Sequence, residues 1–465
     1  MTHGRVQVVG AGLAGCEAAW QLACRGIPVT LSEMKPGQMS PAHHLPTLSE
    51  LVCSNSLRAA RLENAVGLLK EEMRRLGSLI IACADQTALP AGGALAVDRD
   101  QFSRLVTQHI DEHPLIRRVS VRVDAVPDDD LVIIATGPLT DSALFDAINS
   151  TLDTAPLHFF DAAAPIVEAD SIDRTVAFYQ SRYGRGGDDY INCPMDEAEY
   201  EAFWQALVSA RTADVHDFDR RQIFEGCMPI EIMAARGRDT IRFGPLKPVG
   251  LTDPRTGREP YACVQLRQDN HAASLYNLVG FQTRLAFPEQ QRVFRLIPGL
   301  GQAVFVRYGV MHRNTYVPSP QVLDADYSVR KRPGLYFAGQ ITGVEGYVES
   351  AASGLVAGWQ AALQADGLDR AERQARLPGR ETVIGSLGDY ISDERVRHFQ
   401  PMNANFGLVA ALEGTGRLKK EARLRQLIER SLARIDQLAA ADDVRLRFVH
   451  KSVGISMHPD AKNNV

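Results

Sequence analysis

Two cysteines stand in sequence surroundings that suit a reactive thiol. The five positions after Cys53 hold two serines, an asparagine, a leucine and an arginine. Cys227 follows a glycine and stands two positions before a proline, in a turn-like segment. A thiolate adds to electron-poor carbons and also accepts protons, so each residue is a candidate nucleophile or base. For the other cysteines we expect the role of small, buried hydrophobic residues; they are Cys16, Cys24, Cys83, Cys193 and Cys263.

A glycine-rich segment after a short strand-like run at 5–9 is the second chemical signal. Its first glycine permits a tight turn, its second lets backbone approach a pyrophosphate, and its third allows a helix to pack closely on a strand. The helix expected at 16–25 would offer N–H donors to phosphates. Glu33 ends the next strand-like run, where a carboxylate accepts ribose hydroxyls. We therefore expect a dinucleotide to bind Glu33 and the segment Gly10, Ala11, Gly12, Leu13, Ala14 and Gly15.

Two later segments favour FAD as that dinucleotide. The apolar run at 131–135 ends in Thr136 and Gly137, which resembles the strand followed by Thr-Gly in two-lobed flavoproteins. The run at 334–338 resembles their late motif, in which a strand end and a helix N-terminus approach the flavin. Its candidate flavin-binding residues are Gly339, Gln340, Gly343, Gly346 and Tyr347. No second complete glycine motif is visible in the sequence, so we expect no dedicated nicotinamide domain.

Length and pattern predict how these motifs are positioned. The chain has 465 residues, of which 45% are hydrophobic and 23% charged, so one simple core is too small for it. Alternation of strands and helices gives way to short strands and turns, and then returns near residue 334. We expect an α/β protein with a two-lobed, Rossmann-type FAD-binding domain at 1–180 and 330–465 and a mixed α/β insertion domain at 181–329. A C-terminal amphipathic helix is expected at 424–438.

Composition excludes several classes of protein. No run of 18 apolar residues exists and the start does not read as a signal peptide, which favours a cytoplasmic protein without a membrane span. Cysteine and histidine spacing predicts no metal site. The net charge of −5 argues mildly against RNA, although a local basic face is compatible with it. The candidates for such a face, or alternatively for internal salt bridges, are Arg236, Arg238, Arg242, Lys247, Arg307 and Arg313.

Much of the chain resembles the folate- and FAD-dependent tRNA (uracil-5-)-methyltransferases. The resemblance runs from Val6 to about Leu412 and is most specific at 50–58, 224–231, 242–250, 307–315 and 339–350. It departs from the family pattern at 44–49 and in a polar tail beyond about 441, for which we expect little order.

The resemblance implies methylation of C5 of a uridine, in the T-loop of tRNA. The implied carbon donor is 5,10-methylenetetrahydrofolate, and the reductant is FAD reduced by NADPH or NADH, with no obligate protein partner. It also implies that Cys227 adds to C6 of the uracil and that Cys53 accepts a proton or acts beside the flavin. An exchange of these two roles stays open.

Four other functions compete with this interpretation. Ribosomal RNA is an alternative substrate for the same chemistry. A related flavoprotein modifies the wobble uridine of tRNA, but it usually has a partner GTPase and a much longer C-terminal helical region. A flavin-bound RNA chaperone without chemistry is disfavoured by the presence of Cys53 and Cys227. An FAD oxidoreductase of small molecules is disfavoured by the insertion domain and its candidate nucleophile.

Overall fold

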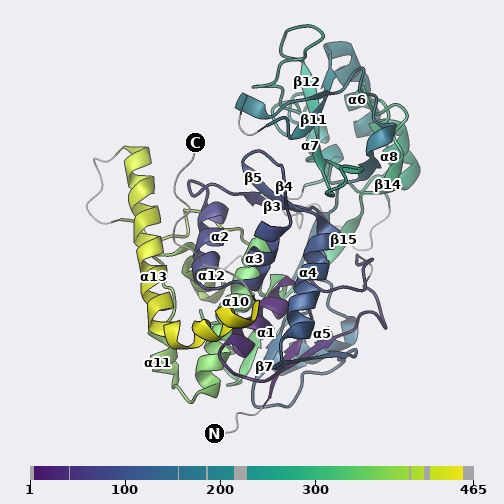
Figure 1. Cartoon of the computed structure of the whole chain (residues 1–465). Helices are drawn as coiled ribbons and strands as arrows, with labels where there is room; N and C mark the ends of the chain where they lie inside the picture. The colour runs from purple at the N-terminus through teal and green to yellow at the C-terminus, as the bar shows by residue number, and fades with distance from the viewer. Residues whose placement is uncertain are drawn as a thin grey trace.

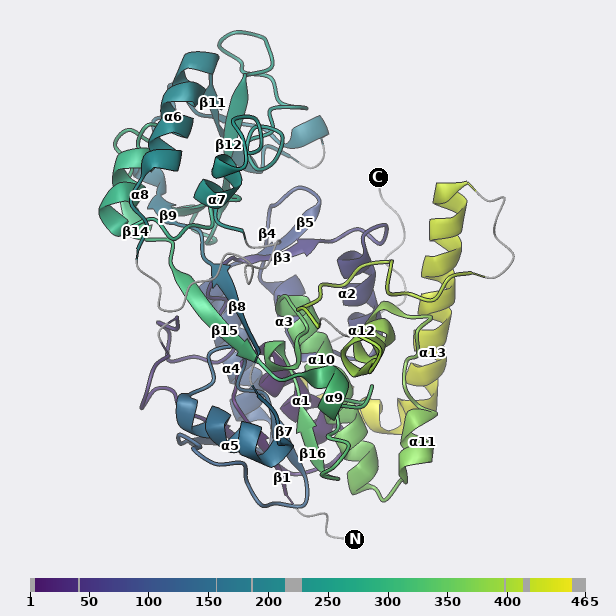
Figure 2. The same cartoon turned by 180° about the vertical axis from the view of Figure 1, so that it is seen from behind.

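The computed structural model describes residues 5–40, 42–155, 157–184, 187–213, 228–396, 399–412 and 419–453. Within these residues the chain builds two main hydrophobic cores, which form two units visible in Figures 1 and 2. The larger unit holds both the start of the chain and its last helices. The smaller unit is formed by the middle of the chain and lies beside the edge of the larger unit that carries β3, β4 and β5.

A five-stranded sheet with the order β16-β7-β1-β2-β6 lies at the centre of the larger unit. All of its pairings are parallel. Its strands, in that order, are Leu335–Phe337, Val132–Ile134, Val6–Val9, Val29–Glu33 and Ile116–Ser120. The strands expected from the sequence near 5–9, 27–32, 131–135 and 334–338 are confirmed. Because β2 and β7 lie on opposite sides of β1, the strand order reverses at the carboxyl end of β1, where sheets of this type bind ligands.

Two long helices cross at close range in this unit, α1 (Leu13–Cys24) and α10 (Tyr347–Ala365). A Cβ added to Gly354 would lie 2.2 Å from the carbonyl oxygen of Ala14, and one added to Gly358 would lie 2.6 Å from that of Ala18. These two glycines, one helical turn apart, therefore let the two backbones touch. The contact fixes the start of α10, which carries Tyr347, relative to the start of α1.

Further helices surround this sheet, and a small antiparallel sheet (β3-β5-β4) lies at its border. The small sheet consists of Ser56–Ala59, Ala94–Val97 and Ala88–Leu89. The helices are α2 Ala65–Arg75, α3 Leu79–Gln86, α4 Arg99–Glu112, α5 Ser142–Leu152, α9 Ser319–Val322, α11 Arg370–Gln374, α12 Val383–Ser392 and α13 Lys420–Val453. Helix α13 extends to Val453, and the little order expected beyond about 441 stays a prediction.

The smaller unit contains a six-stranded sheet with the order β10-β11-β12-β13-β9-β14. Its pairings are antiparallel. The strands, in that order, are Phe178–Tyr179, Tyr190–Met195, Ala262–Gln268, Leu275–Leu278, Ile166–Glu168 and Phe305–Arg307, and the helices are α6 Glu197–Ser209, α7 Ile230–Ala235 and α8 Phe287–Phe294. The core of this unit runs from Ala164 to Phe305, whereas the domain limits at 181 and 329 stay a prediction.

Two paired strands carry the chain between the units. β8 (Leu157–Ala162) leaves the larger unit, and β15 (Met311–Tyr316) returns to it, paired antiparallel over their full length. Figure 2 shows this ribbon spanning the space between the two units. Segments of the larger unit, of the smaller unit and of the ribbon formed by β8 and β15 therefore lie next to one another.

Candidate functional site

The three motif glycines of the first turn have different surroundings. Gly10 has a φ of +95°, and a Cβ on it would lie 2.6 Å from the carbonyl oxygen of Ala135. A Cβ on Gly15 would lie 1.8 Å from the carbonyl oxygen of Gly10, so both positions exclude a side chain. Gly12 faces open space, with nothing within 4 Å of the position of a Cβ, and it begins α1 without a side-chain cap. The exposed N–H groups of this helix N-terminus fit a phosphate group.

Glu33 lies at the end of β2, next to that turn, with 8% of its surface exposed. One of its carboxylate oxygens accepts a hydrogen bond from the N–H of Ala11 at 2.7 Å, and the other accepts one from the N–H of Lys35 at 3.1 Å. Each oxygen retains a lone pair for a further donor. The carboxylate is thus held rigidly at the position where a dinucleotide presents its ribose.

The two later motifs converge on the same turn. The Cα of Thr136 lies 2.8 Å from the position of a Cβ on Gly10, and Gly137 follows with a φ of +73°. Gly339, two residues after β16, has a φ of +86° and donates its N–H to Ser353 Oγ at 2.7 Å. A Cβ on it would lie 3.0 Å from the Cβ of Ala14. The open space at Gly12, the fixed carboxylate and these tight approaches together fit an FAD molecule.

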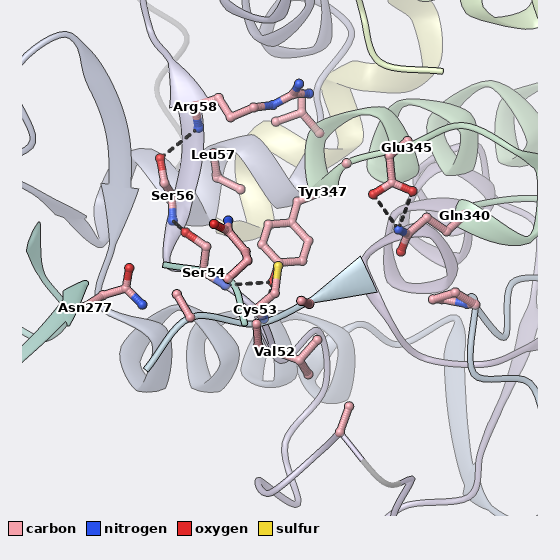
Figure 3. A pocket seen from close by; sticks show the side chains of 18 of the residues that line it. Val52, Cys53, Ser54, Ser56, Leu57, Arg58, Asn277, Gln340, Glu345 and Tyr347 are labelled. Carbon is pink, nitrogen blue, oxygen red and sulfur yellow. Dashed lines mark hydrogen bonds between the residues drawn. The ribbon is translucent and has the colours of Figure 1, made fainter. Parts of the chain in front are cut away.

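A cavity of about 410 Å³ lies between the two units and the connecting ribbon (Figure 3). Gln340, Gly346 and Tyr347 line it, whereas Gly343 does not and instead packs against the ring of Phe399. The polar side chains around the cavity come from all three parts of the structure: Cys53, Ser54, Ser56, Arg58, Arg267, Asn277, Gln282, Asn314, Gln340, Glu345 and Asn403. The candidate residues therefore divide into a group at the glycine turn and a group at this cavity.

Cys53 lies on the cavity wall in direct contact with Tyr347, the first residue of α10. The Tyr347 hydroxyl accepts the N–H of Cys53 at 2.7 Å and the N–H of Ser54 at 3.3 Å. It also lies 2.9 Å from the sulfur of Cys53, and Figure 3 shows the two side chains next to each other. Burial, followed by the neighbouring Cys53 thiol, raises the pKa of Tyr347 well above its ordinary value. The phenol therefore keeps its proton at neutral pH.

The smaller unit holds the Cys53 segment from its other side. Arg267 of β12 donates to Asn55 Oδ1 at 2.9 Å and to Ser54 Oγ at 2.8 Å. Arg99 donates to the carbonyl oxygen of Leu51 at 2.7 Å and forms a 3.0 Å ion pair with Asp269, which follows β12. Both arginines are only 7% exposed. Since Arg267 and Asp269 belong to the smaller unit, the position of Cys53 depends on how that unit is docked.

The remaining described cysteines have no such setting. Burial raises the pKa of Cys16, Cys24 and Cys263 to about 12, and it raises the pKa of Cys83 and Cys193 further. These thiols are therefore un-ionised at neutral pH, in agreement with the expected structural role. Cys227, the candidate nucleophile, lies outside the residues that the structure describes, as does the 214–227 stretch that precedes Met228.

Two arginines of the expected basic face are used in internal contacts. Arg238 is bonded to Glu197 and Glu201, and Arg242 donates to the carbonyl oxygen of Tyr261 at 2.9 Å. For these two arginines the alternative of internal pairing is correct. Lys247 remains on the surface.

Several residues on the cavity wall could not be identified from the sequence as part of a site, or only weakly. The segment around Asn314 reads as a loop, but it is β15, and its pairing with β8 brings Asn314 to the cavity wall. Arg267 and Asn277 lie on neighbouring antiparallel strands of the smaller unit, and nothing in their local sequence marks them. Glu345 falls within the stretch 339–350, one of those that carry the family resemblance, and both of its carboxylate oxygens accept from Gln340 at 2.8 Å.

Neither a metal centre nor a membrane span is found among the described residues. In that part of the chain, histidine, cysteine, aspartate and glutamate side chains form no group of three or more that could hold a metal ion. Within the same residues, each helix is too short or too polar to cross a membrane.

The fold and the glycine turn define a Rossmann-type flavoprotein architecture, and comparisons with known proteins agree. The family model described as "Glucose inhibited division protein A" matches residues 5–369. A solved structure of GidA from Aquifex aeolicus superposes with a TM-score of 0.67 at 16% identity, covering 97% of this chain and 76% of that chain. A second crystal form of the same protein gives a TM-score of 0.66. This likeness confirms the expected fold class.

Curated relatives identify the particular family. The "Methylenetetrahydrofolate--tRNA-(uracil-5-)-methyltransferase TrmFO" of Acetivibrio thermocellus is 61% identical over 404 residues, which cover 87% of this chain and 92% of the relative. The protein of the same name from Geotalea uraniireducens is 56% identical over 437 residues, 94% of this chain and 99% of the relative. The chain belongs to this family of folate-dependent tRNA (uracil-5-)-methyltransferases, as the resemblance implied.

Proposed function

We propose that this chain methylates C5 of a uridine in the T-loop of tRNA, with 5,10-methylenetetrahydrofolate as carbon donor and NADPH or NADH as the source of electrons. The observation that carries the proposal is the cavity in which Cys53 contacts Tyr347, between the predicted FAD-binding unit and the smaller unit. The chain acts in the cytoplasm, where tRNA is modified, and requires no protein partner.

The geometry at the sheet edge supports the assignment of FAD-binding residues. Gly12 and the N-terminus of α1 would hold the pyrophosphate, and Glu33 would hold the adenosine ribose. Gly137, Gly339 and the start of α10 would hold the flavin end, next to the cavity. When bound and reduced, FAD supplies the two electrons that convert a methylene group to a methyl group.

The two cysteines would act on opposite sides of one reaction. The thiolate of Cys227 adds to C6 of the uracil, and the electron pair of the C5=C6 bond moves toward the O4 carbonyl. C5 then bonds to the methylene carbon of the folate as one C–N bond of that carbon breaks and its electron pair passes to nitrogen. The second C–N bond would break in the same sense when the two electrons and the proton that reduced FAD would supply complete the methyl group, and tetrahydrofolate leaves. Finally the thiolate of Cys53 takes the C5 proton, the C–H electron pair restores the C5=C6 bond, and the sulfur of Cys227 leaves C6.

The cavity walls suit a uracil ring. A base paired or stacked in the T-loop must leave the stack to reach a recessed site. The amides of Asn277 and Gln282 and the guanidinium of Arg267 line the cavity and match the donor and acceptor pattern of a uracil edge. A volume of about 410 Å³ lies in the range of small-molecule sites.

A transfer assay tests the substrate and the donor together. FAD-loaded protein and NADPH are incubated with unmodified tRNA and methylene-labelled methylenetetrahydrofolate, and in parallel with methyl-labelled S-adenosylmethionine. Label in 5-methyluridine of tRNA is expected from the folate alone, and Cys227→Ala is expected to lose more than about 10³-fold in rate, because the C6 addition has no substitute. Label appearing in ribosomal RNA while tRNA stays unlabelled would overturn the substrate, and label from S-adenosylmethionine would overturn the donor.

A further inference from the structure

The hydroxyl of Tyr347 has one hydrogen to donate, and the geometry leaves one place for it. Its oxygen already accepts two backbone N–H groups, those of Cys53 and Ser54. A phenol oxygen that accepts two hydrogen bonds has its remaining bonding direction in its own O–H. The sulfur of Cys53, at 2.9 Å, is the partner in that direction. The sulfur therefore accepts a hydrogen bond from Tyr347.

A hydrogen bond of this polarity favours the ionised form of the acceptor. A thiolate accepts an O–H more strongly than a thiol does, and a bond to a charged partner is about twice as strong as one between neutral groups. Because Tyr347 itself resists ionisation, the proton of this contact stays on the phenol oxygen. The negative charge therefore stays on sulfur.

Charged groups face this pair from every neighbouring element. A negative charge on Cys53 would favour the charged form of both Arg99 and Arg267. Of the surrounding carboxylates, Asp269 is committed to Arg99, Glu349 to Arg58, and Glu345 is bonded by Gln340. Arg99 belongs to α4, and Arg267 and Asp269 belong to the β12 region. Arg307 of β14 is paired with Glu50. Arg58 of β3 is paired with Glu349 of α10, and Glu345 lies just before α10. The two buried guanidiniums thus lie close enough to stabilise a thiolate.

We infer that Tyr347 holds Cys53 as a thiolate in the resting protein and is a positioning residue for the proton-accepting sulfur. The role of the thiolate in methyl transfer rests on the proposed function, but its ionisation is a property of the folded chain alone. When Cys53 takes a proton from C5, the S–H bond forms as the C–H bond breaks, and the Tyr347 O–H contact weakens. The weaker contact favours return of that proton to water through the cavity.

Alkylation of Cys53 measures this ionisation directly, since only the thiolate reacts. FAD-loaded protein is treated with iodoacetamide at a series of pH values, and the modified Cys53 peptide is quantified by mass spectrometry. We expect half-maximal reactivity below the value of about 8.5 for a free cysteine. Tyr347→Phe keeps the ring but removes the hydroxyl, and it should raise that midpoint by about one to two pH units, as the loss of one hydrogen bond to a charged group implies.

Two further variants separate this effect from a change in folding. Tyr336→Phe removes another buried hydroxyl that is bonded to α10, at Gln364, and should leave the midpoint unchanged. Arg267→Gln keeps a donor for Ser54 while removing a charge, and should raise the midpoint by less than Tyr347→Phe does. An unchanged midpoint in Tyr347→Phe, with FAD retained, would overturn the inference.

The result of the alkylation experiment is independent of the result of the methyl-transfer assay. If tRNA receives no label but the midpoint shifts as expected, the proposed function fails and the inference about Tyr347 stands. If tRNA is methylated but the midpoint is that of a free cysteine in both proteins, Tyr347 has a merely structural role.

Discussion

Gly12 and Gly15 belong to one short motif but serve different ends. A side chain at Gly15 would collide with the backbone of Gly10, whereas a side chain at Gly12 would enter open space. The sequence motif predicts both glycines equally well. Only the structure shows that Gly15 is needed for close packing, whereas Gly12 leaves open space at the start of α1.

Substitutions at these two glycines should therefore have separable effects. Gly12→Leu is expected to fold normally but to lose bound FAD, because the new side chain occupies the pyrophosphate space. Gly15→Ala is expected to lower the free energy of unfolding by about 1–3 kcal/mol or more, as overpacking does. Flavin absorbance per protein and thermal unfolding measure the two effects. Gly93→Ala, whose Cβ would meet only the end of the Arg61 side chain at 3.8 Å, should change neither.

The contact between Cys53 and Tyr347 could not be predicted from the sequence. Both residues are candidates from their own motifs, one from the polar stretch at 53–58 and one from the late glycine motif. Their 294-residue separation leaves no local pattern that pairs them. The pairing arises because α10 packs on α1 through Gly354 and Gly358, and that packing depends on three-dimensional fit.

At the scale of elements, one buried carboxylate joins three helices. Glu72 of α2 accepts the N–H of Val383 at 2.8 Å and of Ile384 at 2.7 Å, at the start of α12, and also bonds the hydroxyl of Ser431 on α13. Its side chain is fully buried. The amphipathic pattern predicts the central part of α13, but it does not predict that a charged residue anchors the helix.

The titration of Glu72 should make this anchor sensitive to pH. Burial raises the pKa of Glu72 from 4.5 to about 7, although its three hydrogen bonds oppose the shift. The folded state therefore binds the proton more tightly, so stability from this group is full below pH 4.5 and is lost as pH rises through 7. This rise in the pKa of Glu72 corresponds to an upper limit of about 3 kcal/mol on its contribution to the free energy of unfolding.

Urea unfolding at several pH values measures this contribution. Between about pH 5 and pH 8, the wild-type chain should lose unfolding free energy relative to Glu72→Gln, which cannot titrate. Glu71→Gln, on the exposed side of the same helix, should show the same pH dependence as the wild type. Parallel pH curves for the wild type and Glu72→Gln would contradict the assignment.

At the scale of the whole molecule, the sequence predicts the class of fold better than the assembly of the site. Strands β1, β2, β7 and β16 follow from short apolar runs and glycine turns, because a buried parallel sheet is apolar on both faces. The smaller unit was expected only as mixed α/β structure. Its contribution to the Cys53 segment, through Arg267 and Asp269, comes from an antiparallel strand whose local sequence carries no chemical motif.

The arrangement of the units also bears on RNA binding. A chain with a net charge of −5, in which Arg238 and Arg242 are paired internally, offers a limited basic surface to a phosphate backbone. Recognition of tRNA would then depend on the uridine that enters the cavity as well as on phosphate contacts.

The most direct measurement is to find which cysteine carries the RNA when the reaction is stopped before proton removal. Cys53→Ala protein is incubated with FAD, NADPH, methylenetetrahydrofolate and tRNA, and the covalent RNA adduct is mapped by proteolysis and mass spectrometry. Wild-type protein with 5-fluorouridine tRNA, in which C5 has no proton to lose, serves as the positive control. We expect the adduct on Cys227 in both cases and none in Cys227→Ala. An adduct on Cys53 in Cys227→Ala would contradict the assigned roles.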